Sequence, residues 1–384
     1  NMAYAIGVMS GTSLDGIDIA LVDITGYDEF TECELLHYKS YPYDSVTQAE
    51  ILAASHIETS NVALICSLNF KLGKLYSNAI TQFLEEFNVQ SPLEFIAIHG
   101  QTIHHLPNPT NGLTHSTLQI GDPSQLAFDH KTTVISNFRA MDMAAGGNGA
   151  PLVPYTEYIL FHDAHKNRLL QNIGGIGNVT VLPKNCTEDE IFAFDTGPGN
   201  MMINAAMQYF YKKDYDHNGE IAKSGKIIPE LLKKLQSDPY FNELPPKATG
   251  RELFGEDRVN KICEEYAQSP QDVINTLTEL TAWSIADSYQ QFILSKLMID
   301  EVIVGGGGAY NQFLMGRLRY NLPNLIVKRQ EDIGLSSDAK EAIAFAILGN
   351  QTIHRRPSNL ISATGAKMPM ILGNITPNPW ILNR

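Results

Sequence analysis

One short pattern occurs twice in this sequence and limits the folds the chain can adopt: a strand-like run, a glycine-containing turn and a second strand-like run. The first copy lies within residues 3–24 around the turn 10–16, and the second lies within residues 169–182 around the turn 174–178. Short apolar runs bounded by turn residues are typical of buried strands. Two such starts in one chain predict two related domains.

Helical and strand patterns alternate through the rest of the sequence. Further strand-like runs lie at 94–99, 132–135, 191–194 and 301–304. Apolar spacing predicts helices within 61–87 and 274–296, others starting near 200 and 311, and a last one over 338–348. This alternation predicts an α/β fold.

The most glycine-rich short stretch, residues 144–151, is interpreted as the passage between the domains. The expected domains are therefore 2–147 and 148–355. A tail of about 356–384 is expected to pack back on the first domain.

The length, net charge and cysteine spacing of the chain disfavour several classes of protein. The 384 residues suffice for two domains, and a net charge of -14 disfavours a nucleic-acid surface, although it leaves room for a nucleotide site built from backbone N–H groups. The sequence shows neither an apolar run of membrane-spanning length nor a secretory signal pattern, so neither is expected. The four cysteines form no CxxC pair, which favours a reducing, cytoplasmic compartment without a disulfide framework or zinc site.

Three glycine-rich turns each follow a predicted strand: residues 11–16, 174–175 and 305–308. Glycine allows close approach to a phosphate, and successive N–H groups in such turns bind anions. A single turn of this kind is usually only structural, but three are more specific. None fits the P-loop or the Rossmann pattern.

Several polar residues are candidates for chemistry. Asp195 is placed at a strand end before a Gly-Pro-Gly turn, where a carboxylate can act as a general base or simply cap the turn. Asp15 either holds Mg²⁺ or closes its turn. Arg139 suits a carboxylate ligand or a structural ion pair. Glu341 lies in the first turns of a helix, where the helix dipole alone favours an acid.

Three histidines, His99, His104 and His105, lie close together in the sequence. Their spacing fits no zinc pattern, and no acid or thiol is spaced to complete a site. They are interpreted as strand-end and loop residues.

Short motifs occur along nearly the whole chain, at residues 7–18, 99–102, 118–122, 138–139, 144–147, 149–154, 172–175, 195–200, 249–252, 305–307, 341–346 and 364–366. In residues and in order, these motifs resemble those of the anhydro-N-acetylmuramic acid kinases, a family of the actin/hexokinase-like superfamily.

The resemblance implies a two-domain actin-like ATPase fold, also called ribonuclease H-like, with duplicated domains around an ATP and sugar cleft. It implies an ATP-dependent phosphotransferase that opens the 1,6-anhydro ring of 1,6-anhydro-N-acetylmuramic acid with water and phosphorylates O6. The product would be N-acetylmuramic acid 6-phosphate, formed in peptidoglycan recycling. ATP and Mg²⁺ would be required, and a cytoplasmic homodimer is expected.

The resemblance also implies residue roles. Asp195 would be the base that activates water, and Glu341 would assist at the sugar. The expected ATP and phosphate contacts are Ser10, Gly11, Thr12, Ser13, Leu14, Asp15, Gly16, Ile17, Asp18, Gly174, Gly175, Gly305, Gly306 and Gly307. The expected substrate contacts are His99, Gln101, Arg139, Gly197, Pro198 and Asn200, and Asp15 is the expected Mg²⁺ ligand.

The chain departs from the family pattern at a few positions, and other functions remain open. Asn137 and Asn204 stand where the family has an aspartate, so two charges near the predicted site are missing, and Met9 stands where many kinases of the wider superfamily have an aspartate. One alternative is a kinase of the same fold for another amino sugar. A second is an ATP-driven binding protein like actin or the heat-shock chaperones, and a third is an inactive homologue.

Overall fold

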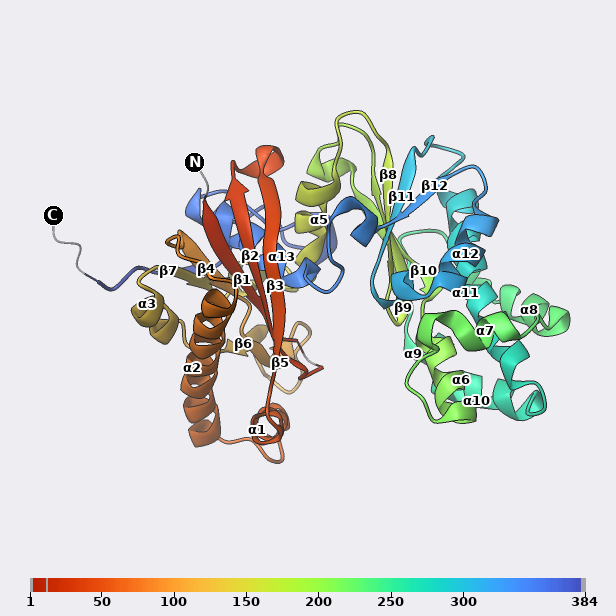
Figure 1. Ribbon diagram of the computed structural model, residues 1–384, viewed down its shortest axis with the longest axis horizontal. Helices are drawn as coiled ribbons and strands as arrows, with labels where there is room; N and C mark the ends of the chain where they lie inside the picture. The colour runs from red at the N-terminus through yellow and green to blue at the C-terminus, as the bar shows by residue number, and fades with distance from the viewer. Residues whose placement is uncertain (1–2, 12, 381–384) are drawn as a thin grey trace. The chain divides into compact units, whose positions relative to one another are not determined.

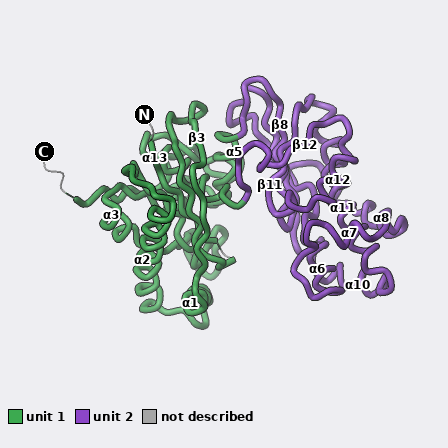
Figure 2. Tube along the Cα trace, viewed as in Figure 1, with its two compact units in different colours: residues 1–160, 338–384 green, residues 161–337 purple. Residues whose placement is uncertain are grey.

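The computed structural model describes residues 3–11 and 13–380, and Thr12, one of the predicted phosphate contacts, lies outside the described residues. The chain forms two compact units, residues 1–160 with 338–384 and residues 161–337 (Figure 2). Each unit contains one large sheet and its own hydrophobic core.

The sheet of unit 1 has the strand order β13-β7-β4-β1-β2-β3 (Figure 1). Strands β1, β2 and β3 form an antiparallel meander, whereas β4 and β7 run parallel to β1. Its strands are β1 (Tyr4–Met9), β2 (Gly16–Thr25), β3 (Glu32–Pro42), β4 (Phe95–Ile98), β7 (Thr133–Ser136) and β13 (Asn374–Thr376). A separate hairpin consists of β5 (Gln101–Leu106) and β6 (Ser116–Ile120).

Helices cover both faces of this sheet. The helices of unit 1 are α1 (Ser45–Ser55), α2 (Val62–Glu86), α3 (Ser124–His130), α4 (Ala140–Ala144), α5 (Val153–Phe161), α13 (Lys340–Ile353) and α14 (Ile361–Thr364), and of these α2 and α13 pack on opposite faces of the sheet. Successive residues of a strand face opposite sides. Accordingly, Ile6 and Val8 of β1 join the core that contains α2, while Gly7 faces α13. A Cβ on Gly7 would collide with the carbonyl oxygen of Ala342, so glycine is needed for this close approach of helix and strand.

The sheet of unit 2 repeats the same topology. Its strands are β8 (Arg168–Ile173), β9 (Ile176–Leu182), β10 (Phe192–Pro198), β11 (Glu301–Gly305) and β12 (Ile326–Arg329). The order is β10-β9-β8-β11-β12, with β8, β9 and β10 antiparallel and β11 and β12 parallel to β8. This matches the order β3-β2-β1-β4-β7 of unit 1, strand for strand. The predicted α/β class with duplicated domains is therefore confirmed.

A group of helices between β10 and β11 forms a second core in unit 2. They are α6 (Met201–Tyr211), α7 (Glu220–Ser224), α8 (Pro229–Gln236), α9 (Arg251–Phe254), α10 (Glu256–Glu265) and α11 (Pro270–Phe292). Helix α11 also packs on the sheet together with α12 (Gln312–Asn321), through Ile285, Tyr289 and Leu314. Short 3-10 turns occur at Asp28–Phe30, Glu188–Glu190, His217–Gly219, Pro239–Asn242, Gly307–Tyr310 and Gln330–Ile333.

The bounds of the compact units differ from those of the predicted domains. Residues 148–160 and 338–355, predicted for the second domain, belong to unit 1. The reason is that α13 packs against β1, β2 and β4, although the sequence places it after the second sheet. The tail also contributes to unit 1, where β13 pairs with β7.

One predicted strand end is wrong. The strand expected to stop at Phe194 continues to Pro198, and Asp195 therefore lies inside β10. A register shift between Asp195 and Gly197 marks a bulge, a feature that bends an edge strand and redirects its side chains.

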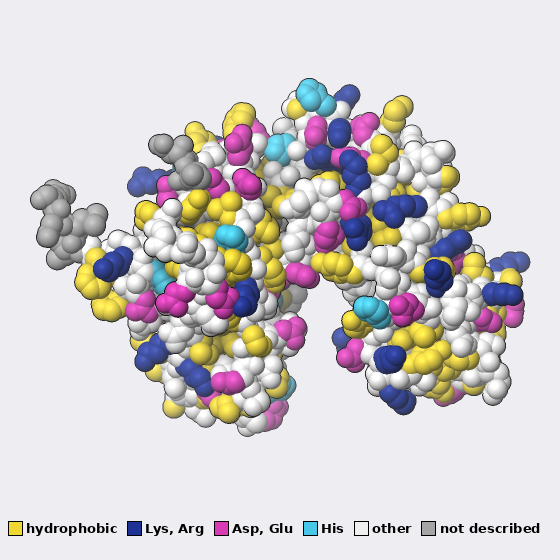
Figure 3. All heavy atoms as spheres, viewed as in Figure 1, with side chains coloured by type: hydrophobic (Ala, Val, Ile, Leu, Met, Phe, Trp, Pro, Cys, Tyr) yellow, Lys and Arg dark blue, Asp and Glu magenta, His cyan; other side chains and the backbone are white. Residues whose placement is uncertain are grey.

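Two surface properties bear on function. Among the described helices, none is long and apolar enough to cross a membrane. On the face drawn in Figure 3, basic and acidic side chains are intermingled.

Candidate active site

Three parallel strands of unit 1 end at the same edge of the sheet. Strands β1, β4 and β7 lead into Ser10, His99 and Asn137, respectively. Ligands of α/β proteins bind outside the carboxyl ends of such strands. The edge thus brings together candidates that are about 130 residues apart in the sequence.

Hydrogen bonds of buried polar side chains hold the backbone of the turn at Ser10 and Gly11. Ser10 Oγ donates to the carbonyl of Gly100 at 2.9 Å and lies 2.7 Å from the hydroxyl of Tyr76. Gln101 Nε2 donates to the carbonyl of Gly11 at 3.1 Å. A side chain on Gly11 would meet almost no other atoms, so the backbone of this turn stays open to a ligand.

The remaining residues of this turn differ in exposure. Ser13 and Asp15 are exposed, whereas Leu14, Gly16 and Ile17 are buried. Leu14 has a left-handed backbone with φ of 59°, an uncommon conformation that a tight loop imposes. The predicted phosphate contacts in this turn are therefore of two kinds: Ser13 and Asp15 have exposed side chains, whereas the buried residues Leu14, Gly16 and Ile17 shape the backbone of the turn.

Two carboxyl groups near this edge have perturbed proton affinity. Burial raises the pKa of Asp18, and the carboxylates of Asp338 and Asp15 act in the same direction, against hydrogen bonds from Ser40 and Tyr38. Partial desolvation followed by repulsion from Asp18 raises the pKa of Glu341, which lies in the first turn of α13, while Lys340 and Arg139 lower it. Glu341 nevertheless stays exposed, so a ligand can reach it.

Arg139 and His99 form a direct contact. Arg139 Nε donates to His99 Nε2 at 2.9 Å, and Arg139 Nη1 donates to the carbonyl of Gly149 at 2.8 Å. His99 Nδ1 lies 2.7 Å from the carbonyl of Gly100. Burial, followed by the positive charge of Arg139, lowers the pKa of His99 to about 3. The imidazole is therefore neutral at physiological pH.

A buried carboxyl supports this arrangement. Asp142 is 0% exposed and accepts hydrogen bonds from Gly149 N at 2.8 Å, Asn359 Nδ2 at 2.7 Å and Thr364 Oγ1 at 2.7 Å. It therefore joins α4, the glycine-rich segment and the C-terminal segment beneath Arg139.

In unit 2, three turns meet at the carboxyl ends of β8, β10 and β11. The backbone N–H groups of Gly199 and Asn200 donate to the carbonyls of Gly175 and Gly174, at 2.9 and 2.7 Å. A Cβ on Gly307 would lie 3.8 Å from Asn200 Nδ2. The predicted residues Gly174, Gly175, Asn200 and Gly307 thus lie close together.

The geometry of these turns fits a phosphate-binding role. A Cβ added to Gly174, Gly175 or Gly307 would find its nearest neighbour 3.4 to 3.8 Å away, so open space borders the backbone. By contrast, a Cβ on Gly306 would crowd Asn172 and Ile173, and Gly306 has a φ of 84°. Gly306 shapes the turn, while the other three can approach a phosphate.

Asp195 is held by the 3-10 turn Pro239–Asn242 and by the segment that follows it. Thr249 N donates to Asp195 Oδ2 at 3.0 Å, Asp195 N donates to the carbonyl of Lys247 at 3.1 Å, and the hydroxyl of Tyr240 donates to the carbonyl of Asp195 at 2.7 Å. Burial raises the pKa of Asp195, and the hydrogen bond from Thr249 opposes this. A carboxylate that is fixed and partly desolvated is suited to accept a proton.

The remaining predicted residues have the following environments. Gly197 and Pro198 are buried in the bulged end of β10, and Gly305 ends β11. Asn137 has a left-handed backbone with φ of 57°, which asparagine tolerates, and Asn204 lies on α6. His104 is exposed, and His105 Nδ1 lies 3.0 Å from Thr117 Oγ1.

The described residues offer few side-chain ligands for a metal ion. In the part of the chain that the structure describes, no group of three or more His, Cys, Asp or Glu side chains can hold a metal ion. Mg²⁺ in kinases takes most of its oxygen ligands from phosphates and water. The exposed carboxylate of Asp15 forms no ion pair with a described residue and fits a single-ligand role of this kind.

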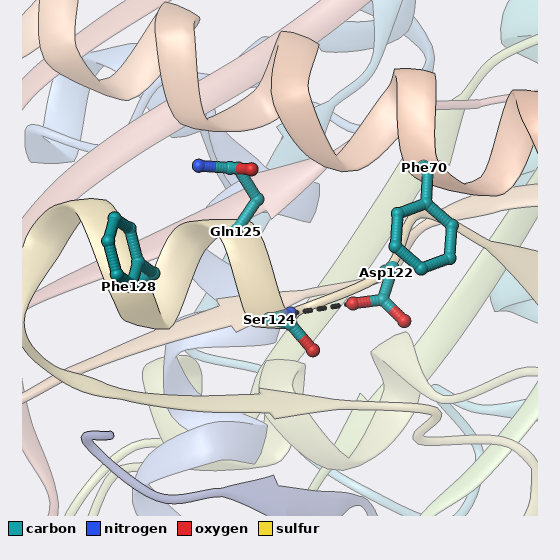
Figure 4. A pocket seen from close by; sticks show the side chains of 5 residues that line it. All are labelled: Phe70, Asp122, Ser124, Gln125 and Phe128. Atoms are coloured by element: carbon teal, nitrogen blue, oxygen red, sulfur yellow. Dashed lines mark hydrogen bonds between the residues drawn. The ribbon is translucent and has the colours of Figure 1, made fainter.

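A pocket elsewhere in unit 1 does not involve the candidate residues. Figure 4 shows it between α2 and α3, lined by Phe70, Asp122, Ser124, Gln125 and Phe128. Asp122 Oδ1 accepts a hydrogen bond from Ser124 N at 2.8 Å, which fixes one wall. The pocket is therefore distinct from the two sheet edges described above.

Sequence reasoning missed the residues that support the candidates. Tyr76, Tyr240 and Lys247 lie far in sequence from the groups they contact, as Asp142 does from Asn359 and Thr364, and none belongs to a recognisable motif. Thr249 belongs to the matching block 249–252, which carries no sign of its partner. Its contact with Asp195 follows from tertiary structure alone.

Together, the repeated α/β topology, the open glycine turns and the partly desolvated carboxyls fit an ATP-dependent phosphotransferase built from two related domains. The sequence model of the family "Anhydro-N-acetylmuramic acid kinase" matches residues 3–378. The chain belongs to this family.

Relatives of known name are similar over the whole length. The anhydro-N-acetylmuramic acid kinase of Bacillus cereus strain Q1 is 53% identical over 377 residues, which are 97% of this chain and 99% of that protein. The kinase of Bacillus thuringiensis subsp. konkukian strain 97-27 shows the same identity and coverage, 53%, 97% and 99%. A solved ROK family glucokinase from Streptomyces griseus in complex with glucose and AMPPNP has a TM-score of 0.38 and 13% identity, covering 91% of this chain and 100% of its own. The family assignment rests on the sequence matches.

Proposed function

We propose that this chain converts 1,6-anhydro-N-acetylmuramic acid, water and ATP into N-acetylmuramic acid 6-phosphate and ADP. Membership of the kinase family supports the reaction. The single observation that carries the chemistry is the partly buried Asp195 carboxyl, fixed by Thr249 beside the glycine turns of unit 2. The product enters the recycling of peptidoglycan.

The proposed chemistry couples two bond changes. Water attacks C1 of the sugar and gives a proton to Asp195, while the bond between C1 and O6 breaks. The electron pair left on O6 attacks the γ-phosphorus, and the bond to the β-phosphate oxygen breaks to release ADP. A proton from water ends on Asp195 and then returns to solvent, so atoms and charge balance.

The glycine turns are assigned to the nucleotide. Backbone N–H groups of Gly174, Gly175 and Gly307 border open space and can donate to phosphate oxygens. The turn from Ser10 to Asp18 and residues Gly305 and Gly306 are assigned the same role from the family resemblance, with Gly306 acting through the shape that it gives the turn. Mg²⁺, when bound through Asp15 and the phosphates, would neutralise charge that develops on the transferred group.

Polar residues of unit 1 are assigned to the sugar. The guanidinium of Arg139 is our candidate for the lactyl carboxylate, because planar guanidinium groups pair well with carboxylates. Glu341, exposed and with a raised pKa, is assigned to a hydroxyl of the sugar. Gln101, Gly197, Pro198 and Asn200 remain proposed substrate contacts, although Gln101 is 1% exposed and already bonded to Gly11.

A coupled assay of ADP release tests the proposal. The sugars to compare are 1,6-anhydro-N-acetylmuramic acid, N-acetylmuramic acid and N-acetylglucosamine, beside a control without sugar. Turnover with the anhydro sugar alone, lost in Asp195→Asn, supports both substrate and base. Turnover with another amino sugar would keep the kinase class and reject the substrate. Hydrolysis without sugar would favour an ATP-driven binding protein.

Two further properties are proposed from the family resemblance: a homodimer and a cytoplasmic location. Light scattering coupled to gel filtration measures the first, and fractionation of the source cells measures the second. A monomer at micromolar concentration would reject the dimer.

A further inference from the structure

Arg139 is held at two points, and both of its partners are uncharged. Its Nε and Nη1 groups donate to His99 Nε2 and to the carbonyl of Gly149, at 2.9 and 2.8 Å. Arg139 forms no ion pair with any described residue, and its Nη2 group has no hydrogen-bond partner among them. The positive charge is therefore fixed in direction but not neutralised.

The tautomer of His99 follows from its two contacts. The nearby carbonyl of Gly100 can only accept, so Nδ1 carries the hydrogen. Nε2 is then the acceptor that Arg139 Nε requires. Burial and the guanidinium keep the ring neutral, since its pKa is about 3, against the effect of hydrogen bonds to the backbones of Gly100 and Ser10.

Packing fixes the orientation of the imidazole ring. His99 is 5% exposed, and its centroid lies 5.0 Å from that of Phe345 on α13. Phe345 in turn lies 5.4 Å from Phe138, the neighbour of Arg139. The acceptor lone pair of His99 therefore points in a constant direction.

Nearby carboxyl groups leave the guanidinium available. Glu341 and Asp142 raise the pKa of Arg139 through space, while burial, the larger effect, lowers it. Both carboxylate oxygens of Asp142 already accept hydrogen bonds, from Gly149, Asn359 and Thr364. A desolvated, oriented guanidinium with free N–H groups is suited to an anionic ligand.

We propose that His99 is a positioning residue that holds Arg139 toward the carboxylate of the sugar, so that the pair selects an anionic sugar over a neutral one. This proposal rests on the proposed function. It replaces a direct contact of His99 with substrate, because both ring nitrogens are already bonded within the protein. An acidic partner in place of His99 would neutralise Arg139 and remove the selection.

The test compares two sugars that differ only in the carboxylate-bearing lactyl group: 1,6-anhydro-N-acetylmuramic acid and 1,6-anhydro-N-acetylglucosamine. Steady-state kcat and KM are measured for the wild type, His99→Phe and His99→Gln. Phenylalanine keeps the packing of an aromatic ring but removes the acceptor atom Nε2. The carbonyl of Gly100, which loses the His99 contact, still accepts a hydrogen bond from Ser10 Oγ. Glutamine places an amide oxygen near the position of Nε2.

His99→Phe is expected to raise KM for the anionic sugar about 10-fold, the effect of one lost hydrogen bond, with little change in kcat. The kinetics of the neutral sugar should not change, and His99→Gln should recover most of the KM. Equal changes for both sugars, or a fall in kcat alone, would overturn the proposal. If His99→Phe does not fold, His99→Asn, which can still donate to Gly100 but is too short to reach Arg139, takes its place.

Arg139→Ala separates this proposal from the proposed function. If the wild type does not turn over the anhydro sugar, the proposed function itself fails. If Arg139→Ala leaves KM for the anionic sugar unchanged, the carboxylate contact fails, and the role of His99 with it. If Arg139→Ala raises that KM but His99→Phe does not, only the positioning role is refuted.

Discussion

Replacing Asp142 tests how the fold supports the candidate site. The carboxyl is completely buried and accepts three hydrogen bonds, from Gly149, Asn359 and Thr364. In Asp142→Ala each of these donors loses its acceptor, and a buried donor without a partner costs about 1–3 kcal/mol. Because Asn359 Nδ2 also donates to the carbonyl of Met368 at 3.5 Å, we expect a total loss of about 3–5 kcal/mol rather than the full sum.

The measurement is unfolding by urea and by heat, followed by fluorescence. For a unit of this size, such a loss lowers the unfolding midpoint of unit 1 by roughly 10 °C. Asp142→Asn keeps the shape and part of the acceptor capacity, so its effect should be intermediate. Glu58→Ala is the matched control, since Glu58 is exposed and its effect should stay within about 0.5 kcal/mol. A loss below about 1 kcal/mol in Asp142→Ala would refute the reasoning.

Three further predictions concern the site. Asp195→Asn should lower kcat by about 10²- to 10⁴-fold. The midpoint of thermal unfolding should stay equal or rise in this variant, because a partly desolvated charge is removed. A lower midpoint would indicate a structural role for Asp195. Burial raises the pKa of Asp195, so kcat should fall with falling pH at pH values above the ordinary pKa range of an aspartate. The contribution of Asp195 to the free energy of unfolding should decrease as pH rises through this raised pKa, because the folded state disfavours the charged form. A kcat independent of pH down to 4 would contradict this. Gly7→Ala should displace α13 and cost about 1–3 kcal/mol, measured by urea unfolding, because the new methyl group collides with the carbonyl of Ala342.

The elements with clear periodicity were predictable from sequence. The hairpin around residues 10–16, helix α2 and the strand and helix around the turn 305–308 match the prediction. Each has apolar residues at a regular spacing between turn residues, so local pattern and fold agree. The resemblance to the kinase family was likewise confirmed.

Other features depend on contacts that local sequence does not encode. The end of β10 was misplaced because Gly197 and Pro198 indicate a turn, yet a bulge accommodates them in the strand. The domain bounds differ because α13 packs on the first sheet, close to Gly7. The partners of Asp195 and Arg139 are set by tertiary structure, so no sequence spacing could identify them.

The most direct test of the proposed reaction is mass spectrometry of the product formed in oxygen-18-labelled water. Opening of the anhydro ring by water predicts one labelled oxygen at C1 of the sugar phosphate from the earliest time points, together with one ADP per product. Unlabelled product incubated in labelled water measures exchange at C1, and Asp195→Asn should form almost no product. A phosphorylated sugar that lacks the label, or ADP formed without sugar phosphate, would contradict the account.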